Sequence, residues 1–185
     1  EAMRVAELFR RELLLTLLLA AAVPAAAGAQ TTALGSRDAV IAGTLSTANR
    51  GEITHAQIAL ERGTEPAVRA FASRMLREHS IADEQLRRVL TEMAAQDAVQ
   101  RIAREIEENC TRTAEVLRSL PEEVFDRTYM DLQIERHEWL LRAIDGTLLP
   151  NARKETVKAQ LRMIRTSVAN HLDRARQPIP LQKRR

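Results

Sequence analysis

The sequence contains one cysteine, Cys110, so no intramolecular disulfide can form and the fold must be stabilised by its packed core. Aromatic residues make up only 3% of the chain, which has 6 glycines and 6 prolines. A chain that is poor in strand-forming and turn-forming residues, but rich in alanine, leucine, arginine and glutamate, favours helices over sheets. These shortages predict an all-α protein.

Long stretches of one charge are also missing, although 29% of the residues are charged and the net charge is +3. Arginine and glutamate alternate irregularly over residues 101–108, which is typical of a solvated helix face. Nucleic-acid binding requires concentrated positive charge, so we expect no nucleic-acid partner. Only Lys183, Arg184 and Arg185 form a basic cluster, in residues 178–185, which we expect to be a disordered tail.

Several enzyme motifs do not occur in the chain. We find no nucleophile elbow, no glycine-rich phosphate loop and no cysteine pair. Spacing alone also identifies no set of serine, histidine and aspartate. We therefore expect this protein to act by binding rather than by catalysis.

One apolar run, Leu13–Val23, is long enough to stand out. It follows arginines at positions 4, 10 and 11 and precedes Ala27-Gly28-Ala29, which is the order of a secretory signal and its cleavage site. A run of about eleven residues is too short to span a bilayer as a helix. We expect residues 1–29 to be a cleavable signal peptide and the mature protein to be periplasmic or secreted, without stable membrane insertion. An uncleaved membrane anchor is the alternative.

The rest of the chain predicts four long helices and one connecting helix. Residues 30–36 are expected to form a flexible leader and residues 37–177 the folded domain. Breaks at Gly63, Pro66, Pro121 and Pro150 divide this domain into helices over residues 38–62, 64–96, 98–119, 121–149 and 152–176. No strand pattern and no internal repeat is present.

All four histidines fall on apolar helix stripes, one on each long helix. At 100° per residue, His55 shares its stripe with Glu52, while His79, His137 and His171 align with aliphatic residues. If the connecting helix returns the chain to the end where the second helix starts, these five residues occupy one central zone. The topology therefore decides whether they form a site.

Two interpretations of the five residues are open. They can form a polar layer of hydrogen-bonded core side chains, which specifies how the helices align. They can instead bind one transition metal ion, Zn, Cu or Fe, because imidazole and carboxylate groups are ligands for these metals. In that case His79 and His137 are the first expected ligands with Glu52 as the third, and His55 and His171 form a second pair.

The third long helix carries a second apolar row, Phe125, Leu132 and Trp139, which faces away from His137. One interpretation is that the connecting helix over residues 98–119 covers this row. The other is that the row is exposed and forms the interface of a homo-oligomer or of a complex with another protein.

Five separated motifs resemble those of one family. They are Gly51-Glu52-Ile53 with Ala56–Leu60, Ala72–Met75 with Glu78-His79, Phe125–Met130, His137-Glu138-Trp139, and His171-Leu172 with Ala175. Over about residues 37–176 the chain resembles the exported, ferritin-like domain-of-unknown-function family 4142. The resemblance implies a ferritin-like four-helix bundle with a helical crossover between the second and third long helices, but no activity. The sequence departs from the family pattern at Glu78, where an aspartate before the histidine is more usual.

Ferritin-like carboxylate oxidases take a Glu-x-x-His motif from each of two helices and a further glutamate from each of the other two. Here only Glu52 and His55 have that spacing. A dinuclear site would lack bridging carboxylates, so we do not expect a di-iron oxidase.

Overall fold

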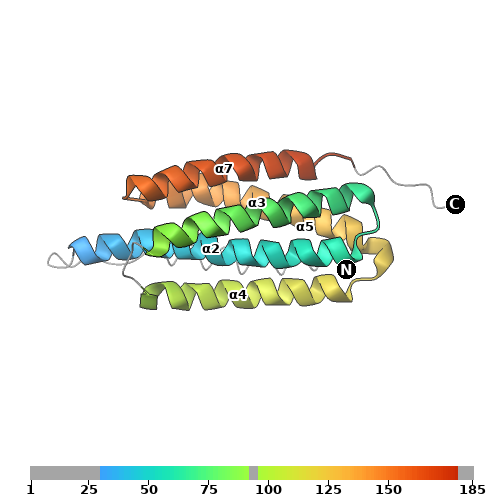
Figure 1. The fold of residues 1–185 in the computed structure, drawn as a ribbon, viewed down its shortest axis with the longest axis horizontal. Coiled ribbons are helices and arrows are strands. Elements are labelled where there is room, and N and C mark those ends of the chain that lie inside the picture. Colours follow the sequence, from blue (N-terminus) through green and yellow to red (C-terminus); the bar gives the residue numbers. More distant parts are fainter. Residues whose placement is uncertain (1–29, 92–95, 179–185) are drawn as a thin grey trace.

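In the computed structural model, five long helices lie side by side (Figure 1). The structure describes the backbone of residues 30–91 and 96–178 and the side chains of residues 37–91 and 103–178. All regular structure in these ranges is helical, which confirms the predicted all-α class. The elements are α2 (Gln30–Arg62), α3 (Pro66–Thr91), α4 (Gln96–Ser119), α5 (Glu122–Ala143), the π-helical segment η1 (Ile144–Leu148), α6 (Leu149–Asn151) and α7 (Glu155–Ala175). The expected signal peptide and residues 179–185 of the expected tail lie outside the described residues.

Two predicted helix starts need correction. α2 begins at Gln30, so residues 30–36 are helical rather than a leader. These residues include no proline, and Gly35 alone does not outweigh the preference of the following residues for a helix. α7 begins at Glu155 rather than near position 152, because Ala152 and Lys154 have extended backbone angles.

The segment η1 was not predicted. It joins α5 to α6, so the helical path that starts at Glu122 continues to Asn151. Pro150 has no amide hydrogen to donate to the carbonyl four residues earlier, and its ring collides with that carbonyl in a regular α-helix. The wider π-helical turn lies directly before this residue, so the helix passes Pro150 and ends one residue later.

The chain direction alternates from one long helix to the next. In Figure 1, α2, α4 and α7 run one way and α3 and α5 run the other. α2 packs against α3 and α4, α3 packs against α7, and α7 packs against α5. α4 runs opposite to α3 and returns the chain to the end where α3 begins. α5 therefore begins at the same end as α3. This is the arrangement under which the predicted site residues share one level.

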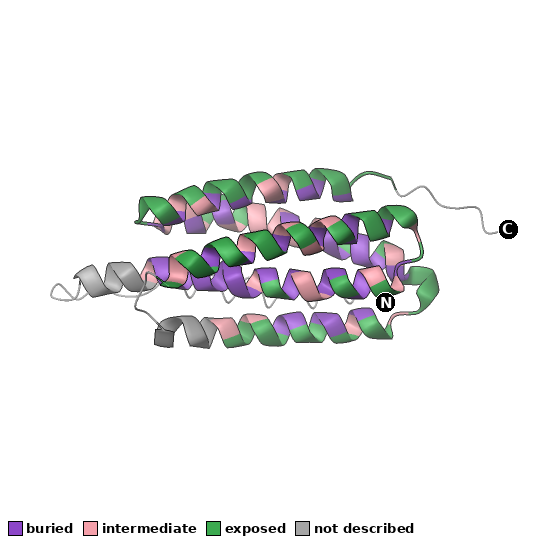
Figure 2. Ribbon diagram, viewed as in Figure 1, coloured by how far each residue is buried: buried purple, intermediate pink, exposed green. Residues whose placement is uncertain are grey.

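The apolar core is divided in two along the helix axes. One cluster includes Ala56 and Ile58 of α2, and the other includes Ile41 and Leu45 of the same helix. The segments between the clusters contribute polar side chains that are buried or, for Arg136, 10% exposed. We call them the polar layer: Asn49, Glu52, His55, His79, Gln133, Arg136, His137 and His171. Figure 2 shows the buried residues along the inward faces of the helices and the exposed ones outside.

Two aspartates connect the turns at opposite ends of the helices. Asp126 accepts hydrogen bonds from the backbone amides of Thr64 and Glu65, at 3.1 and 2.8 Å. The fully buried Asp38 accepts from the amides of Arg153 and Lys154, both at 2.8 Å. These bonds fix the level of α5 against α3 and of α7 against α2. They thereby help to set which residues of different helices meet in the middle.

The apolar row on α5 is not a free surface. Phe125 and Leu132 are 0% and 5% exposed and belong to the same apolar cluster as Ala114 and Leu117 of α4. Trp139 is half-buried and packs against the second cluster. Of the two interpretations, cover by the connecting helix is therefore correct for Phe125 and Leu132, and an interface that uses these two side chains is wrong.

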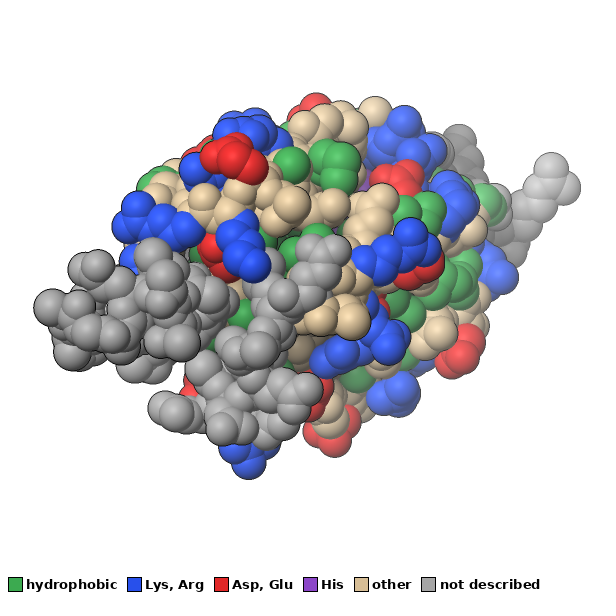
Figure 3. Space-filling view, turned by 60° about the vertical axis from the view of Figure 1, so that its left-hand side comes forward, with side chains coloured by type: hydrophobic (Ala, Val, Ile, Leu, Met, Phe, Trp, Pro, Cys, Tyr) green, Lys and Arg blue, Asp and Glu red, His purple; other side chains and the backbone are tan. Residues whose placement is uncertain are grey.

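The outer surface is polar and mixed in charge. On the face shown in Figure 3, basic and acidic side chains lie next to one another between apolar ones. Of the helices that the structure describes, none is both long enough and apolar enough to cross a membrane.

Gly51 allows α2 and α4 to approach closely. A Cβ atom at position 51 would lie 2.2 Å from Sγ and 2.8 Å from Cβ of Cys110. Gly51→Ala should therefore lower the free energy of unfolding by about 1–3 kcal/mol, because the helices must separate. Urea unfolding monitored by circular dichroism measures this change.

The matched control is Gly146→Ala, since nothing lies within 4 Å of a Cβ added at Gly146. That variant should be neutral or more stable by up to about 1 kcal/mol. Equal stability of Gly51→Ala and Gly146→Ala would contradict the close approach of α2 and α4 at Gly51.

Candidate metal site

Three imidazole rings meet in the polar layer, from three different helices. One ring nitrogen each of His79 in α3, His137 in α5 and His171 in α7 lies within 4.8 Å of the others. The ring centroids are 5.2–6.0 Å apart, and the exposed fractions of the three residues are 5% or less. We call these residues the histidine triad.

Each ring of the triad has a hydrogen-bond acceptor on its outer side. Nδ1 of His79 lies 2.8 Å from Oδ1 of Asn49, and Nδ1 of His137 lies 2.8 Å from the carbonyl oxygen of Gln133. Nε2 of His171 lies 2.8 Å from Oε2 of Glu78. Since amide, carbonyl and carboxylate oxygens only accept, each outer ring nitrogen must carry the proton and donate it.

The inner nitrogens are consequently left without a hydrogen. A neutral imidazole has one donor and one acceptor nitrogen, so Nε2 of His79, Nε2 of His137 and Nδ1 of His171 each present a lone pair. Nε2 of His137 and Nδ1 of His171 are only 3.2 Å apart, and Nε2 of His79 is buried without a hydrogen-bond partner. Lone pairs that face each other at this distance repel unless a cation lies between them.

A proton is a poor candidate for that cation near neutral pH. Burial, together with the neighbouring basic groups and despite the attraction of Glu52, lowers the pKa of His79 to about 3 and that of His137 to about 4. Burial also lowers the pKa of His171, although its bond to Glu78 opposes this shift. All three rings are therefore neutral at pH 7, the form in which histidine binds metals.

Glu52 lies beside the triad but is bound by other partners. Its Oε1 is 2.5 Å from Nε of Arg136, and its Oε2 accepts a hydrogen bond of 2.9 Å from Nε2 of Gln133. Burial favours the protonated carboxyl, but the Arg136 guanidinium and smaller contributions from nearby histidines outweigh it, so the pKa of Glu52 lies well below its usual range. Glu52 is a buried carboxylate in an ion pair.

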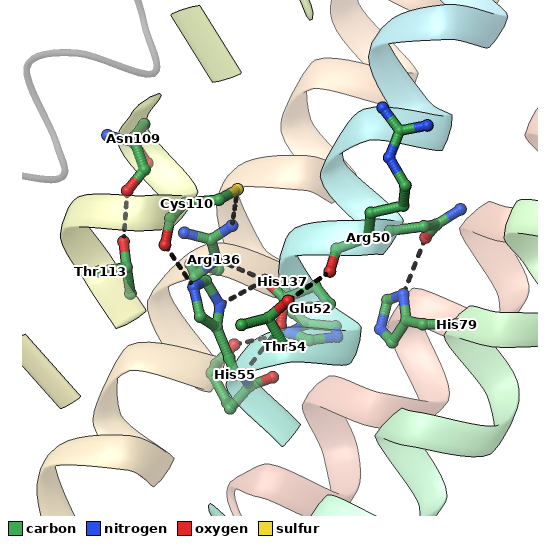
Figure 4. A network of polar contacts seen from close by, with 12 residues as sticks. Arg50, Glu52, Thr54, His55, His79, Asn109, Cys110, Thr113, Arg136 and His137 are labelled. Carbon is green, nitrogen blue, oxygen red and sulfur yellow. Dashed lines mark hydrogen bonds and ion pairs between the residues drawn. The ribbon is translucent and has the colours of Figure 1, made fainter. Parts of the chain in front are cut away.

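His55 points to a different part of the molecule. Its Nε2 lies 3.0 Å from the carbonyl oxygen of Cys110 in α4, and its Nδ1 is 3.9 Å from Oε1 of Glu52, beyond hydrogen-bond distance. In Figure 4, His55, Arg136 and Cys110 lie on one side of Glu52 and His79 lies on the other. His55 therefore connects α2 to α4 and does not belong to the triad.

The structure thus groups three of the five predicted ligands and separates two. His171 lies against His137, so its predicted pairing with His55 was wrong. That prediction assumed that the last helix extends as far as its neighbours. α7 has 21 residues and is about 31 Å long, whereas the helical path Glu122–Asn151 is about 45 Å long. α7 therefore ends short of the end where α5 begins (Figure 1). As a result His171 lies at the level of His137, with its Nδ1 3.2 Å from Nε2 of that residue.

Three further residues of this region were not predicted from the sequence as part of the site. Asn49 had a usable signal, because it lies four positions after Leu45 and three before Glu52 on the inner stripe of α2. Glu78 and Arg136 precede triad histidines and occupy helix positions next to the inner stripe, where charged residues normally meet solvent. Only the packed structure shows that Glu78 reaches His171 and that Arg136 reaches Glu52.

A cavity of about 280 Å³ adjoins the triad. The triad, Glu52 and Glu78 lie at one end of it, and all four of the helices α2, α3, α5 and α7 contribute to its walls. Most of the wall is apolar. An ion held by the three histidines would therefore keep one side free of protein ligands.

The family model of a domain of unknown function (DUF4142) matches residues 23–177. The chain belongs to this family. The match confirms the resemblance carried by the five motifs, and it spans every helix that contributes to the triad. Neither the curated proteins nor the solved structures include a match to this chain.

Removing the charge of Glu52 should destabilise the fold. The side chains of Glu52 and Arg136 are 8% and 10% exposed, so Glu52→Gln leaves a buried guanidinium without its counter-ion. We expect the free energy of unfolding to fall by about 3–5 kcal/mol. The control Glu107→Gln breaks the half-exposed pair with Arg50 and should cost about 0–1 kcal/mol. Equal effects of the two substitutions in chemical denaturation would contradict the buried pair.

Lowering the pH should destabilise the metal-free protein already above the pH range in which carboxylates become protonated. The folded-state pKa values of about 3 for His79 and about 4 for His137 lie below the ordinary value of 6.5. Below that value the unfolded chain binds protons that the folded one does not. The free energy of unfolding should therefore fall from pH 6.5 to pH 5, by up to about 1.4 kcal/mol per pH unit for each histidine.

Urea unfolding at several pH values, after chelation of metal, measures this slope. His137→Gln should reduce it, because the substituted side chain does not titrate. An unchanged slope in this variant, or a wild-type stability that is constant over the range, would contradict burial of neutral histidines.

Proposed function

We propose that this protein binds a single divalent transition metal ion through His79, His137 and His171. The observation that carries the proposal is the convergence of three unprotonated nitrogens whose outer partners hold the rings in place. Metal-binding histidines characteristically donate the N–H of the ring nitrogen that does not bind the metal to a carbonyl or carboxylate, which fixes the tautomer and the orientation of the ring. All three members of the triad have such a partner.

The ligand set favours one ion over two. Among the described residues, the triad is the only group of three or more histidine, cysteine, aspartate or glutamate side chains close enough to share an ion. Glu52 is neutralised by Arg136, and Glu78 is bonded to His171 and Arg74. The described part of the chain therefore has no carboxylates free to bridge two iron ions, which argues against a di-iron oxidase.

Three neutral imidazoles suit zinc, copper and iron(II), and zinc sites with three protein ligands keep a fourth position for another molecule. Here the fourth position faces the cavity. The remaining part of the polar layer, with Glu52, Arg136 and His55, is better explained as structural, because its bonds join α2 to α5 and to α4. The polar layer therefore has two parts: the histidine triad, which binds the metal ion, and the adjacent residues, which hold the helices together.

The context of this function is an exported, ferritin-like four-helix bundle. α2, α3, α5 and α7 correspond to the four helices, and α4 to the crossover between the second and third. The alternating helix directions and the family match support this assignment. The signal-like sequence of residues 1–29 supports a periplasmic or secreted location, where such a protein acts by binding.

Isothermal titration calorimetry of the chelator-treated, untagged protein with Zn²⁺ and Cu²⁺ tests the proposal. We expect one ion per chain, and loss of this stoichiometric binding in His79→Ala, His137→Ala and His171→Ala. Glu78→Ala should weaken binding by about 10–100-fold, because it removes the acceptor behind His171.

His55→Ala is the matched control, since His55 is equally buried but lies outside the triad. It should bind metal like the wild type, even if its stability is lower. Equal loss in His55→Ala and in the triad variants, or no binding by the wild type, would contradict the proposal and leave the triad a structural feature.

A further inference from the structure

The cavity beside the triad is elongated along the helix axes. Its wall extends from His171 to Met163 on α7, from Glu52 to Leu45 on α2, and from His79 to Gln85 on α3. At 1.5 Å per residue these spans are about 12, 10 and 9 Å. Because α2 and α7 run opposite to α3, all three lead away from the triad in the same direction.

The two ends of the cavity differ in chemistry. Among the described residues, the charged side chains of the wall are Glu52, Glu78 and Arg136. Glu78 and Arg136 directly precede triad histidines, and Glu52 pairs with Arg136. Of the described residues that line the distal wall, none is charged, and the polar ones are Gln85 and Ser167. The other distal residues are apolar, including Leu45, Ala82, Leu140, Ile164 and Val168.

Two exposed apolar residues line the cavity. Ile81 in α3 and Met163 in α7 are 52% and 48% exposed, and both line the cavity. They are two of the three large apolar residues that the described part of the chain leaves exposed. A mostly apolar cavity with exposed apolar residues on its wall and a few polar groups at one end is the arrangement of a small-ligand site.

We propose that this cavity binds a small monocarboxylic acid with an apolar chain, whose carboxylate occupies the open fourth position of the metal ion. The inference rests on the proposed metal site, since without the ion a carboxylate would face Glu52 and Glu78. The three neutral histidines leave the charge of the ion uncompensated, so an anionic oxygen ligand is favoured there. The uncharged distal wall excludes a second charge at the other end of the ligand.

The volume is consistent with this class of ligand. Pockets for small molecules are commonly about 300–1,000 Å³, and this cavity, at about 280 Å³, lies just below that range. A medium-length alkyl chain fits such a space, whereas a large cofactor does not. Octanoate is therefore a suitable probe.

The experiment uses the folded chain loaded with Co²⁺, which replaces Zn²⁺ and has a visible absorption spectrum. The absorption reports on ligands of the ion, and the emission of Trp139, the only tryptophan of the chain, reports on the cavity that it lines. We expect octanoate to change both signals at the same ligand concentration. Octanedioate has the same length but a second carboxylate, and should bind at least about tenfold more weakly.

A matched pair of variants on α3 locates the binding. Ala82 lines the cavity and Ala70 is exposed away from it. Ala82→Phe should weaken octanoate binding at least about tenfold while Co²⁺ still binds, whereas Ala70→Phe should leave both unchanged. If Ala82→Phe does not fold, Ser167→Phe on the half-exposed opposite wall replaces it, with the same expected result.

The outcomes separate the two proposals. Normal Co²⁺ binding without any effect of octanoate, or with equal affinity for octanedioate, overturns this inference and leaves the metal site intact. Absence of Co²⁺ binding overturns the metal site and this inference with it. An equal response of Trp139 to octanoate in the metal-free protein would show an apolar cavity whose ligand does not use the ion, which also contradicts the inference.

Discussion

The acceptors behind the triad determine what the interior of this protein can do. Asn49, the Gln133 carbonyl and Glu78 each take the hydrogen of one ring, so three lone pairs must face inwards. A buried polar group without a partner is costly, and each of the three inner nitrogens lacks a hydrogen-bond donor. A single cation satisfies all of them at once, and burial makes a proton unsuitable because it lowers the pKa values of the rings.

The rest of the fold keeps that arrangement in place. Apolar clusters lie on both sides of the polar layer, so a shift of one helix along its axis would place polar side chains among aliphatic ones. Asp38 and Asp126 hold the turns at the two ends, and the Glu52–Arg136 pair joins α2 to α5 next to the triad. Gly51 brings α4 close enough for the Cys110 carbonyl to bond His55. Glu52, Arg136 and His55, whose polar groups are bonded to other helices, thus hold the histidine triad in position.

Much of this could be predicted from the sequence, because helical periodicity is a local property. Helix composition, the breaks at Gly63 and Pro121, and the inward orientation of all four histidines follow from it. The level of His171 could not be predicted, since it depends on where α7 ends relative to α5 and on the extension of α5 through η1. The roles of Arg136 and Glu78 also depend on tertiary packing, because helical periodicity predicts that a charged residue beside an inner stripe faces solvent. The sequence placed Glu52 and His55 on the inner stripe, but their partners on α4 and α5 decide that they do not join the triad.

Nitrogen-15 NMR of the imidazole rings in the metal-free protein at pH 7 tests the central claim most directly. We predict neutral rings with the proton on Nδ1 of His79, on Nδ1 of His137 and on Nε2 of His171. When one equivalent of Zn²⁺ is added, the other nitrogen of each of these rings should change its resonance, and neither nitrogen of His55 should do so. A proton on an inner nitrogen of His137 or His171, or a Zn²⁺ effect confined to His55, would contradict this claim.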